Sequence, residues 1–184
     1  MVKKSWEKKV DNKGFTLVEL IVVLVILAIL AAILVPALLG YIDRAKGSQL
    51  VLNGKSVLTA AQAEASNAYG TAKDAETIAT KFTADICKRI GETADTPDDS
   101  GAWFSTGVTP AKAEATDAGH KAFTIKYCVY WEGDKGIYFN GSSWEEGLTK
   151  DAAQAAFTSG DAADKHYGSF TKASGTVTGV AYTN

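Results

Sequence analysis

The longest apolar stretch of the chain is Phe15–Leu39, which reads FTLVELIVVLVILAILAAILVPALL. After Glu19 the chain has no charged or polar side chain until Tyr41. As a helix, Leu20–Leu39 would span roughly 30 Å, the thickness of the hydrocarbon core of a bilayer. Core helices of soluble proteins rarely run this long without a polar face, and Pro36 does not oppose insertion, because proline occurs in membrane helices. The stretch therefore predicts a membrane-inserting helix.

The residues before this stretch indicate its orientation. Residues 1–14 carry five lysines against Glu7 and Asp11, so the positive-inside rule keeps this end in the cytoplasm and sends the residues after Leu39 outside. A secretory signal peptide fits poorly, because the apolar run is too long and no small-x-small cleavage site follows it. An uncut signal anchor fits better but leaves Glu19 unexplained, since a carboxylate inside a membrane helix is costly.

The residues around Glu19 resemble the class III signal of type IV prepilins. The family pattern is a short basic leader that ends in glycine, followed by phenylalanine, a glutamate five residues after the glycine, and a proline further along the apolar run. The matching residues are Lys13-Gly14-Phe15-Thr16-Leu17-Val18-Glu19-Leu20 and Pro36. The resemblance covers residues 1–60.

This resemblance implies both processing and assembly. A prepilin peptidase would cut between Gly14 and Phe15, where glycine lets the backbone approach the enzyme closely, and the same enzyme would methylate the freed amine of Phe15. The helix with Pro36 would remain as the assembly element. Glu19 would face the positive Phe15 amine of a neighbouring subunit and set the register. The implied partners are further copies of the chain in a helical filament, the peptidase-methylase, a pilus assembly platform and, before assembly, the membrane.

The chain divides into four expected parts. These are a cleaved leader at 1–14, a hydrophobic membrane and filament-core helix at 15–40, its amphipathic continuation at 41–69 and an extracellular globular head at 70–184. In the continuation, small and apolar residues share one helical face. They are Leu50, Gly54, Val57, Leu58, Ala61, Ala65 and Ala68. A face of such low bulk predicts close packing against a sheet.

The expected fold class is α+β, a long N-terminal helix packed on an antiparallel sheet. A second helix is expected at 74–90, with Gly91 as its C-terminal stop. A polar loop is expected at 92–101, and a third helix at 150–157.

The strands follow from period-two alternation. The segment 123–131 alternates most clearly and predicts the central strand. After a turn at 132–136, residues 137–139 return as its hairpin partner. Two threonine-rich and glycine-rich segments, 166–172 and 176–182, are expected to form edge strands.

Cys87 and Cys128 are the only two cysteines in the sequence. An even pair in an exported domain favours a disulfide, which would tie the second helix to the central strand. Two free, buried thiols are the alternative.

Composition limits the function. A net charge of −2 argues against binding nucleic acid by neutralising phosphates. His120 and His166 have no neighbours at triad or metal-ligand spacing, and no phosphate-cradling glycine loop or nucleophile elbow is present. Asp95, Asp98 and Asp99 could ligate calcium, but their spacing matches no EF-hand loop. We therefore expect no enzymatic activity, cofactor, metal or direct nucleic-acid binding.

The expected function is that of a structural subunit, the major pilin, of a type IV pilus. It would lie in the inner membrane with its N-terminus inside and then in an extracellular pilus. A pseudopilin of a type II secretion or DNA-uptake machine is one alternative, although a head of 115 residues, 70–184, favours a pilin. A signal-anchored extracellular binding protein is the other.

Overall fold

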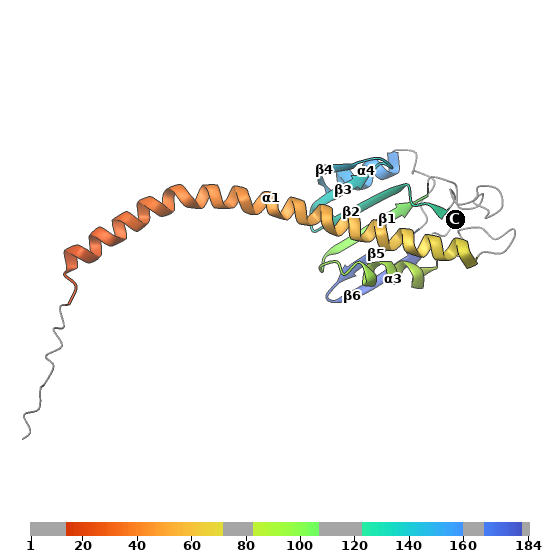
Figure 1. Cartoon of the computed structure of the whole chain (residues 1–184), viewed down its shortest axis with the longest axis horizontal. Coiled ribbons are helices and arrows are strands. Elements are labelled where there is room, and N and C mark those ends of the chain that lie inside the picture. Colours follow the sequence, from red (N-terminus) through yellow and green to blue (C-terminus); the bar gives the residue numbers. More distant parts are fainter. Residues whose placement is uncertain (1–13, 72–82, 107–122, 160–167, 182–184) are drawn as a thin grey trace, which may run out of the picture. The chain divides into compact units, whose positions relative to one another are not determined.

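The structure is a computed structural model (Figure 1). It describes residues 14–71, 83–106, 123–159 and 168–181. The chain separates into two compact units, residues 1–44 and 45–184. Helix α1 (Leu17–Thr71) is continuous and contains Pro36, and a six-stranded antiparallel sheet follows it. The predicted α+β, pilin-like fold class is confirmed.

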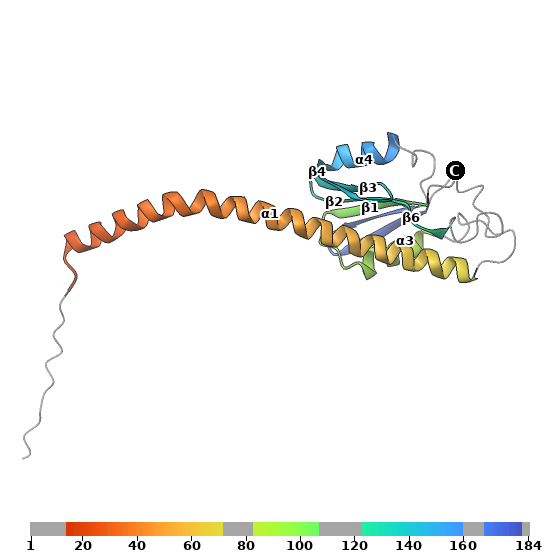
Figure 2. The same ribbon diagram turned by 45° about the horizontal axis from the view of Figure 1, so that its top comes forward.

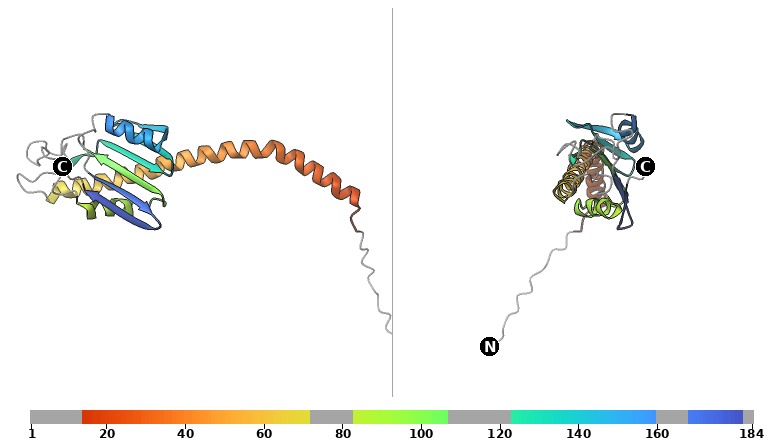
Figure 3. Two further views of the ribbon diagram at one scale, coloured as in Figure 1. Left: turned by 180° about the vertical axis from the view of Figure 1, so that it is seen from behind. Right: turned by 90° about the vertical axis from the view of Figure 1, so that its right-hand side faces the viewer.

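The second unit holds the sheet and two shorter helices. The elements after α1 are α3 (Ala84–Thr93), β1 (Ser100–Ser105), β2 (Tyr127–Glu132), β3 (Lys135–Phe139), β4 (Trp144–Thr149), α4 (Lys150–Ser159), β5 (Gly168–Ala173) and β6 (Thr176–Ala181). The strand order is β4-β3-β2-β1-β5-β6, and every neighbouring pair is antiparallel. Seen from behind, the strands lie side by side in one sheet, with β6 in blue at one edge (Figure 3).

The part of α1 in the second unit packs its small face on the sheet, as predicted. The buried residues are Leu50, Gly54, Val57, Ala60, Ala61, Ala65 and Ala68, and Leu58 is half-buried. A Cβ at Gly54 would lie 2.5 Å from Cδ1 of Ile137 and 3.2 Å from the indole of Trp144. Glycine at this position therefore lets α1 approach β3 and β4 closely.

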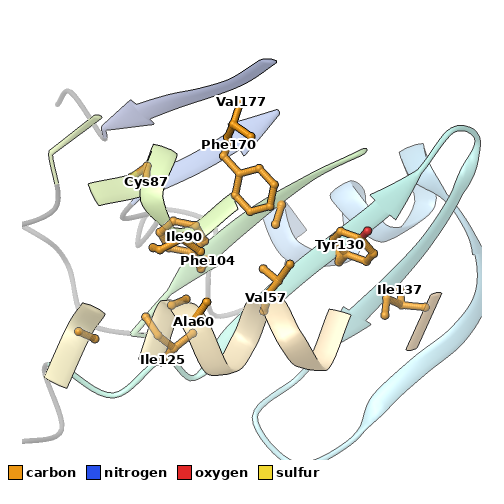
Figure 4. Packing of buried hydrophobic residues seen from close by; sticks show 14 of the residues in the cluster. Val57, Ala60, Cys87, Ile90, Phe104, Ile125, Tyr130, Ile137, Phe170 and Val177 are labelled. Carbon is orange, nitrogen blue, oxygen red and sulfur yellow. The ribbon is translucent and has the colours of Figure 1, made fainter. Parts of the chain in front are cut away.

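The sheet is covered on both faces. Helices α1 and α3 lie on one face and α4 on the other (Figure 2). The core between α1, α3 and the sheet includes Val57, Ile90 and Phe104 (Figure 4), while a second cluster beneath α4 includes Val129 and Phe157. Because both faces are covered, all of β2 except Glu132 is buried.

The central strand, predicted from residue 123, begins later in the structure. β2 starts at Tyr127, and the hairpin with β3 is confirmed by the pairing of Glu132 with Lys135. Phe123 and Ile125 are buried as the alternation indicated, but the side chain of Gln62 hydrogen-bonds the backbone of both. At these residues the side chain of Gln62 makes backbone hydrogen bonds of the kind that a neighbouring strand would make.

The predicted second helix, 74–90, is confirmed over 84–90, where α3 lies. α3 begins at Ala84 with Thr83 as its N-cap, and residues 74–82 lie outside the described residues. Gly91 does not stop the helix, which continues to Thr93. A Cβ at Gly91 would lie 2.7 Å from the side chains of Phe170 and Val177, so this glycine permits close helix–sheet packing instead.

Two strands of the sheet are not among those predicted from the sequence. β1 starts at Ser100, inside the expected polar loop, and it lies in the middle of the sheet between β2 and β5. β4 follows shortly after β3 and forms one edge of the sheet. The strand expected at 166–172 corresponds to β5. The prediction that it lies at an edge is wrong, because β6 pairs with its outer side and makes β5 internal. The helix expected at 150–157 is confirmed as α4.

Candidate cleavage and assembly segment

Of the described residues, three precede α1, and all three are exposed: Gly14, Phe15 and Thr16. Phe15 is 86% exposed, and apart from the two adjacent residues no atom lies within 4 Å of where a Cβ on Gly14 would be. The Gly14–Phe15 peptide bond therefore lies in uncovered, non-helical backbone just before the first turn of α1. Exposed backbone of this kind is accessible to a peptidase.

Thr16 and Glu19 cap the start of α1 reciprocally. Oε2 of Glu19 accepts hydrogen bonds from the backbone N–H of Thr16 at 2.9 Å and from its hydroxyl at 2.7 Å. Oγ1 of Thr16 accepts from the backbone N–H of Glu19 at 3.3 Å. This is a capping box, in which side chains satisfy backbone donors that a helix start leaves unpaired. The spacing T-x-x-E signals the box in the sequence, but the prediction for Glu19 did not include it.

The capping box leaves the charge of Glu19 without a counter-ion. Both groups that bond Oε2 belong to Thr16 and are neutral, and no cation pairs with Glu19 in the part of the chain that the structure describes. A carboxylate at the start of an apolar helix therefore still has an unmatched charge, which is costly in a medium of low dielectric constant.

The first half of α1 is apolar on every side. Its large apolar side chains from Leu17 to Leu39 are 50–75% exposed, and Glu19 is the single charged residue among them. The helix is long and apolar enough to cross a membrane. A helix that is hydrophobic all round needs apolar surroundings, which lipid or packed helices of other copies can supply. Pro36 lies within this surface without interrupting the helix.

Residues 10–35 match the family model of the prokaryotic N-terminal methylation motif. The segment is a type IV pilin-like prepilin signal. The match contains Gly14, Phe15 and Glu19, and Pro36 follows it directly. No curated protein and no solved structure matches the chain.

A prepilin signal of this type is found in type IV pilin-like proteins and in pseudopilins. It implies processing by a prepilin peptidase and assembly into pilus-like polymers. The apolar helix that carries it fits membrane anchoring before assembly.

The structure does not contain the predicted disulfide. Cys87 and Cys128 are free thiols, both buried. On the sheet, Phe104 of β1 pairs with Cys128 on one side and with Gly168 on the other. Cys87 reaches the sheet at Gly168, where its sulfur would lie 2.5 Å from an added Cβ. The aromatic residue of the intervening strand therefore separates the two cysteines.

Burial makes both thiols poor nucleophiles. Desolvation raises the pKa of Cys87 to about 11, partly opposed by a backbone hydrogen bond at Ser169. Desolvation raises the pKa of Cys128 to about 12. The thiolate is the reactive form, so neither cysteine is suited to redox or nucleophilic chemistry in the folded head.

The acidic loop contributes structure. Oδ1 of Asp98 accepts a hydrogen bond from the backbone N–H of Gly175 at 2.8 Å, and the carbonyl of Asp99 accepts one from Gly133 at 2.8 Å. These bonds connect the loop to the β5–β6 and β2–β3 turns. No metal-ligating cluster occurs among the described residues, and His120 and His166 fall outside them.

Polar contacts fix the second half of α1 to the head. Asn53 donates to Oε1 of Glu132 at 2.6 Å, and the same oxygen accepts from the hydroxyl of Tyr130 at 2.7 Å. Further along the helix, Glu64 accepts two bonds from the guanidinium of Arg89 at 3.2 and 2.9 Å. The first contact joins this half of α1 to β2, and the second joins it to α3.

Proposed function

We propose that the chain is the structural subunit of a type IV pilus filament. It inserts as a prepilin, is cut between Gly14 and Phe15, is methylated on the Phe15 amine and polymerises through α1. The observation that carries the proposal is the prepilin signal at residues 10–35, placed on a helix whose first half is apolar all round.

The structure supports separate roles for the head and for the first half of α1. The described head buries its own core on both faces of the sheet, so it does not need the first half of α1 to fold. In contrast, the apolar side chains of Leu17–Leu39 have no protein cover. Lipid covers this surface before assembly, and packing against the same surface of other copies keeps it out of water in the filament, with close helix–helix contacts in place of the lipid contacts.

In this proposal Glu19 sets the axial register between neighbouring copies. Cleavage converts the Phe15 amide nitrogen into an amine, which creates a new positive charge at the depth of the unmatched carboxylate. A neighbouring copy can supply this amine to Glu19, and a charge pair that is costly to leave unmatched then selects one axial offset between copies.

Mass spectrometry of intact surface protein tests the proposal. We expect a chain that starts at Phe15 and is heavier by about 14 Da, the mass of one added methylene. A chain that retains residues 1–14 on the cell surface would contradict the proposal and indicate a signal-anchored extracellular protein instead.

We propose more specifically that the chain is a major pilin. Its abundance in surface filaments separates this proposal from the pseudopilin alternative. A major pilin should form the bulk of sheared surface filaments, and deletion of its gene should remove them. If the filaments persist unchanged in the deletion strain, the major-pilin assignment is wrong. The size of the head, residues 70–184, favours the pilin.

A further inference from the structure

We propose that Asn140 is a site of covalent modification, at which the chain converts its own asparagine to aspartate or isoaspartate. Asn140 and Gly141 lie in the turn between β3 and β4. The only co-reactant is water. The modification goes beyond the proposed filament and does not depend on it.

Both ends of this turn are fixed, while its middle is open to water. Phe139 pairs with Trp144 where the two strands meet the turn, and the centres of their rings lie 5.3 Å apart. The backbone N–H of Asn140 donates to the carbonyl of Ser143 at 3.2 Å. Residues 141–143 are exposed. The fold therefore holds an Asn-Gly pair in a defined turn that water can reach.

The side chain of Asn140 is folded over the backbone that follows it. Its Oδ1 accepts hydrogen bonds from the backbone N–H groups of Ser142 and Ser143, both at 3.0 Å. Its Nδ2 donates to Oε1 of Glu145 at 3.2 Å, which determines the end of the amide that faces the two N–H groups. This conformation turns Cγ of Asn140 toward the backbone nitrogen of Gly141.

Gly141 is suited to attack this carbon. Its backbone N–H makes no hydrogen bond with any residue that the structure describes, so no native bond has to break first. Glycine has no side chain that would block the approach. The φ of Gly141 is +95°, a conformation that glycine adopts without strain.

The reaction proceeds in two steps. The nitrogen of Gly141 attacks Cγ of Asn140, so that an N–Cγ bond forms and the Cγ–Nδ2 bond breaks. Nδ2 leaves as ammonia with the proton of the Gly141 N–H. Negative charge develops on Oδ1 during the attack, and the N–H groups of Ser142 and Ser143 stabilise it as an oxyanion hole does. Water then opens the cyclic imide at one of its two carbonyls and yields aspartate or isoaspartate.

A second Asn-Gly pair, Asn53 and Gly54, is protected by the fold. It lies inside α1, where the N–H of Gly54 donates to a carbonyl one turn earlier in the helix. Ring closure would break that bond and distort the helical backbone. The amide of Asn53 also bonds to Gln49 and Glu132. We therefore expect conversion at Asn140 and not at Asn53.

Conversion changes the electrostatics of the turn. The amide of Asn140 now donates to Glu145, but an ionised carboxylate at position 140 can only accept. Two carboxylates would then face each other without a proton between them, and their repulsion should loosen the turn. Because the released ammonia is lost, the product accumulates with the age of the molecule.

Peptide mapping by mass spectrometry tests the site in the full chain, purified in detergent and incubated at mildly alkaline pH. Conversion adds about 1 Da, and in heavy-oxygen water the product should carry one oxygen from the solvent. In the native protein Asn140 should convert at least about tenfold faster than Asn53, which corresponds to about 1.4 kcal/mol in activation free energy. In urea, where the fold protects neither pair, the two rates should agree. Equal rates in the native protein, or a rate at Asn140 that is lower in the native protein than in urea, would overturn the proposal.

Variants test the effect on the turn. Asn140→Asp should lower the melting temperature of the head by about 2–4 °C. Glu145→Gln is the matched control and should leave it unchanged, because its amide oxygen still accepts from Asn140. The double variant Asn140→Asp/Glu145→Gln should recover the loss, because the new amide can donate across the turn. An unchanged melting temperature of Asn140→Asp, or a double variant without recovery, would overturn the predicted effect of the modification.

Discussion

Gln62 of α1 and Ile125 are joined by a hydrogen bond of 2.7 Å from the backbone N–H of Ile125 to Oε1 of Gln62. The other half of the amide, Nε2, donates to the carbonyl of Phe123 at 3.1 Å. One helix side chain thus satisfies a donor and an acceptor of the segment that leads into β2. This explains why the alternating pattern over 123–126 is buried on one side without forming a strand.

Gln62→Leu should destabilise the head by about 1–3 kcal/mol, because it leaves a partly buried N–H and a carbonyl without partners. Urea unfolding of the purified chain would measure this. Asn67→Ala, at an exposed position further along α1, is the control and should change the free energy of unfolding by less than about 0.5 kcal/mol. Equal stability of the two variants would show that the Gln62 bridge contributes nothing.

Gly179→Ala should prevent α3 from seating on β6. An added Cβ would lie 2.1 Å from the carbonyl oxygen of Ala84 and 2.4 Å from the nitrogen of Lys88, and backbone atoms cannot move aside as a side-chain tip can. We expect a loss of about 3 kcal/mol or more. Gly47→Ala, where no atom lies within 4 Å of the new Cβ, should instead stabilise α1 by up to about 1 kcal/mol. Thermal unfolding of both variants would decide, and a stable Gly179→Ala head would contradict the packing described above.

The buried thiols predict a loss of stability at alkaline pH. Burial raises the pKa of Cys128 to about 12, above its value in the unfolded chain. The protonated thiol therefore stabilises the fold fully below the unfolded pKa, and this contribution declines as the pH rises toward the folded pKa. Unfolding titrations between pH 8 and 11 should show a steeper decline for the wild type than for Cys128→Ala. Burial also raises the pKa of Tyr130, which adds a decline of the same sign to both proteins. Parallel curves would refute the role of Cys128.

The same thiols should resist labelling in the native protein. Cys87 and Cys128 are both buried and free, so a thiol reagent should label neither quickly in buffer and both in denaturant, with no reductant needed. If denatured, unreduced protein yields no free thiol, the two cysteines are bonded and the packing around Phe104 differs from the structure.

Glu19 allows the capping role and the charge role to be separated. Glu19→Gln keeps an oxygen that can accept from Thr16 but removes the charge, whereas Glu19→Ala removes both. If the carboxylate pairs with the Phe15 amine of a neighbouring copy, both variants should insert into the membrane and keep a folded head, and both should fail to assemble. Filament yields by electron microscopy are the measurement. Normal filaments from Glu19→Gln would show that capping, and not charge pairing, is what Glu19 supplies.

Features that depend on local chemistry could be predicted from the amino-acid sequence alone. The length and uniform apolarity of Leu20–Leu39 require an apolar environment whatever the head does. The run from Gly14 to Glu19 identified the prepilin signal, and helical spacing identified the face of α1 that packs on the sheet, because both patterns lie within a few adjacent turns. The β2–β3 hairpin followed for the same reason, since a short turn joins its strands.

Features that depend on distant neighbours became apparent in the folded chain alone. β1 has a short sequence of small and aromatic residues and becomes the centre of the sheet because β2 and β5 pair with its two sides. Gly91 looks like a helix stop in the sequence, but the side chain of Phe170, nearly eighty residues away, gives it a packing role. Cys87 and Cys128 occupy one core and remain unbonded because Phe104 lies between them. The spacing of residues along the sequence does not tell which strand lies between two others. The position of β1, the role of Gly91 and the separation of the cysteines therefore follow from how the strands pair and pack.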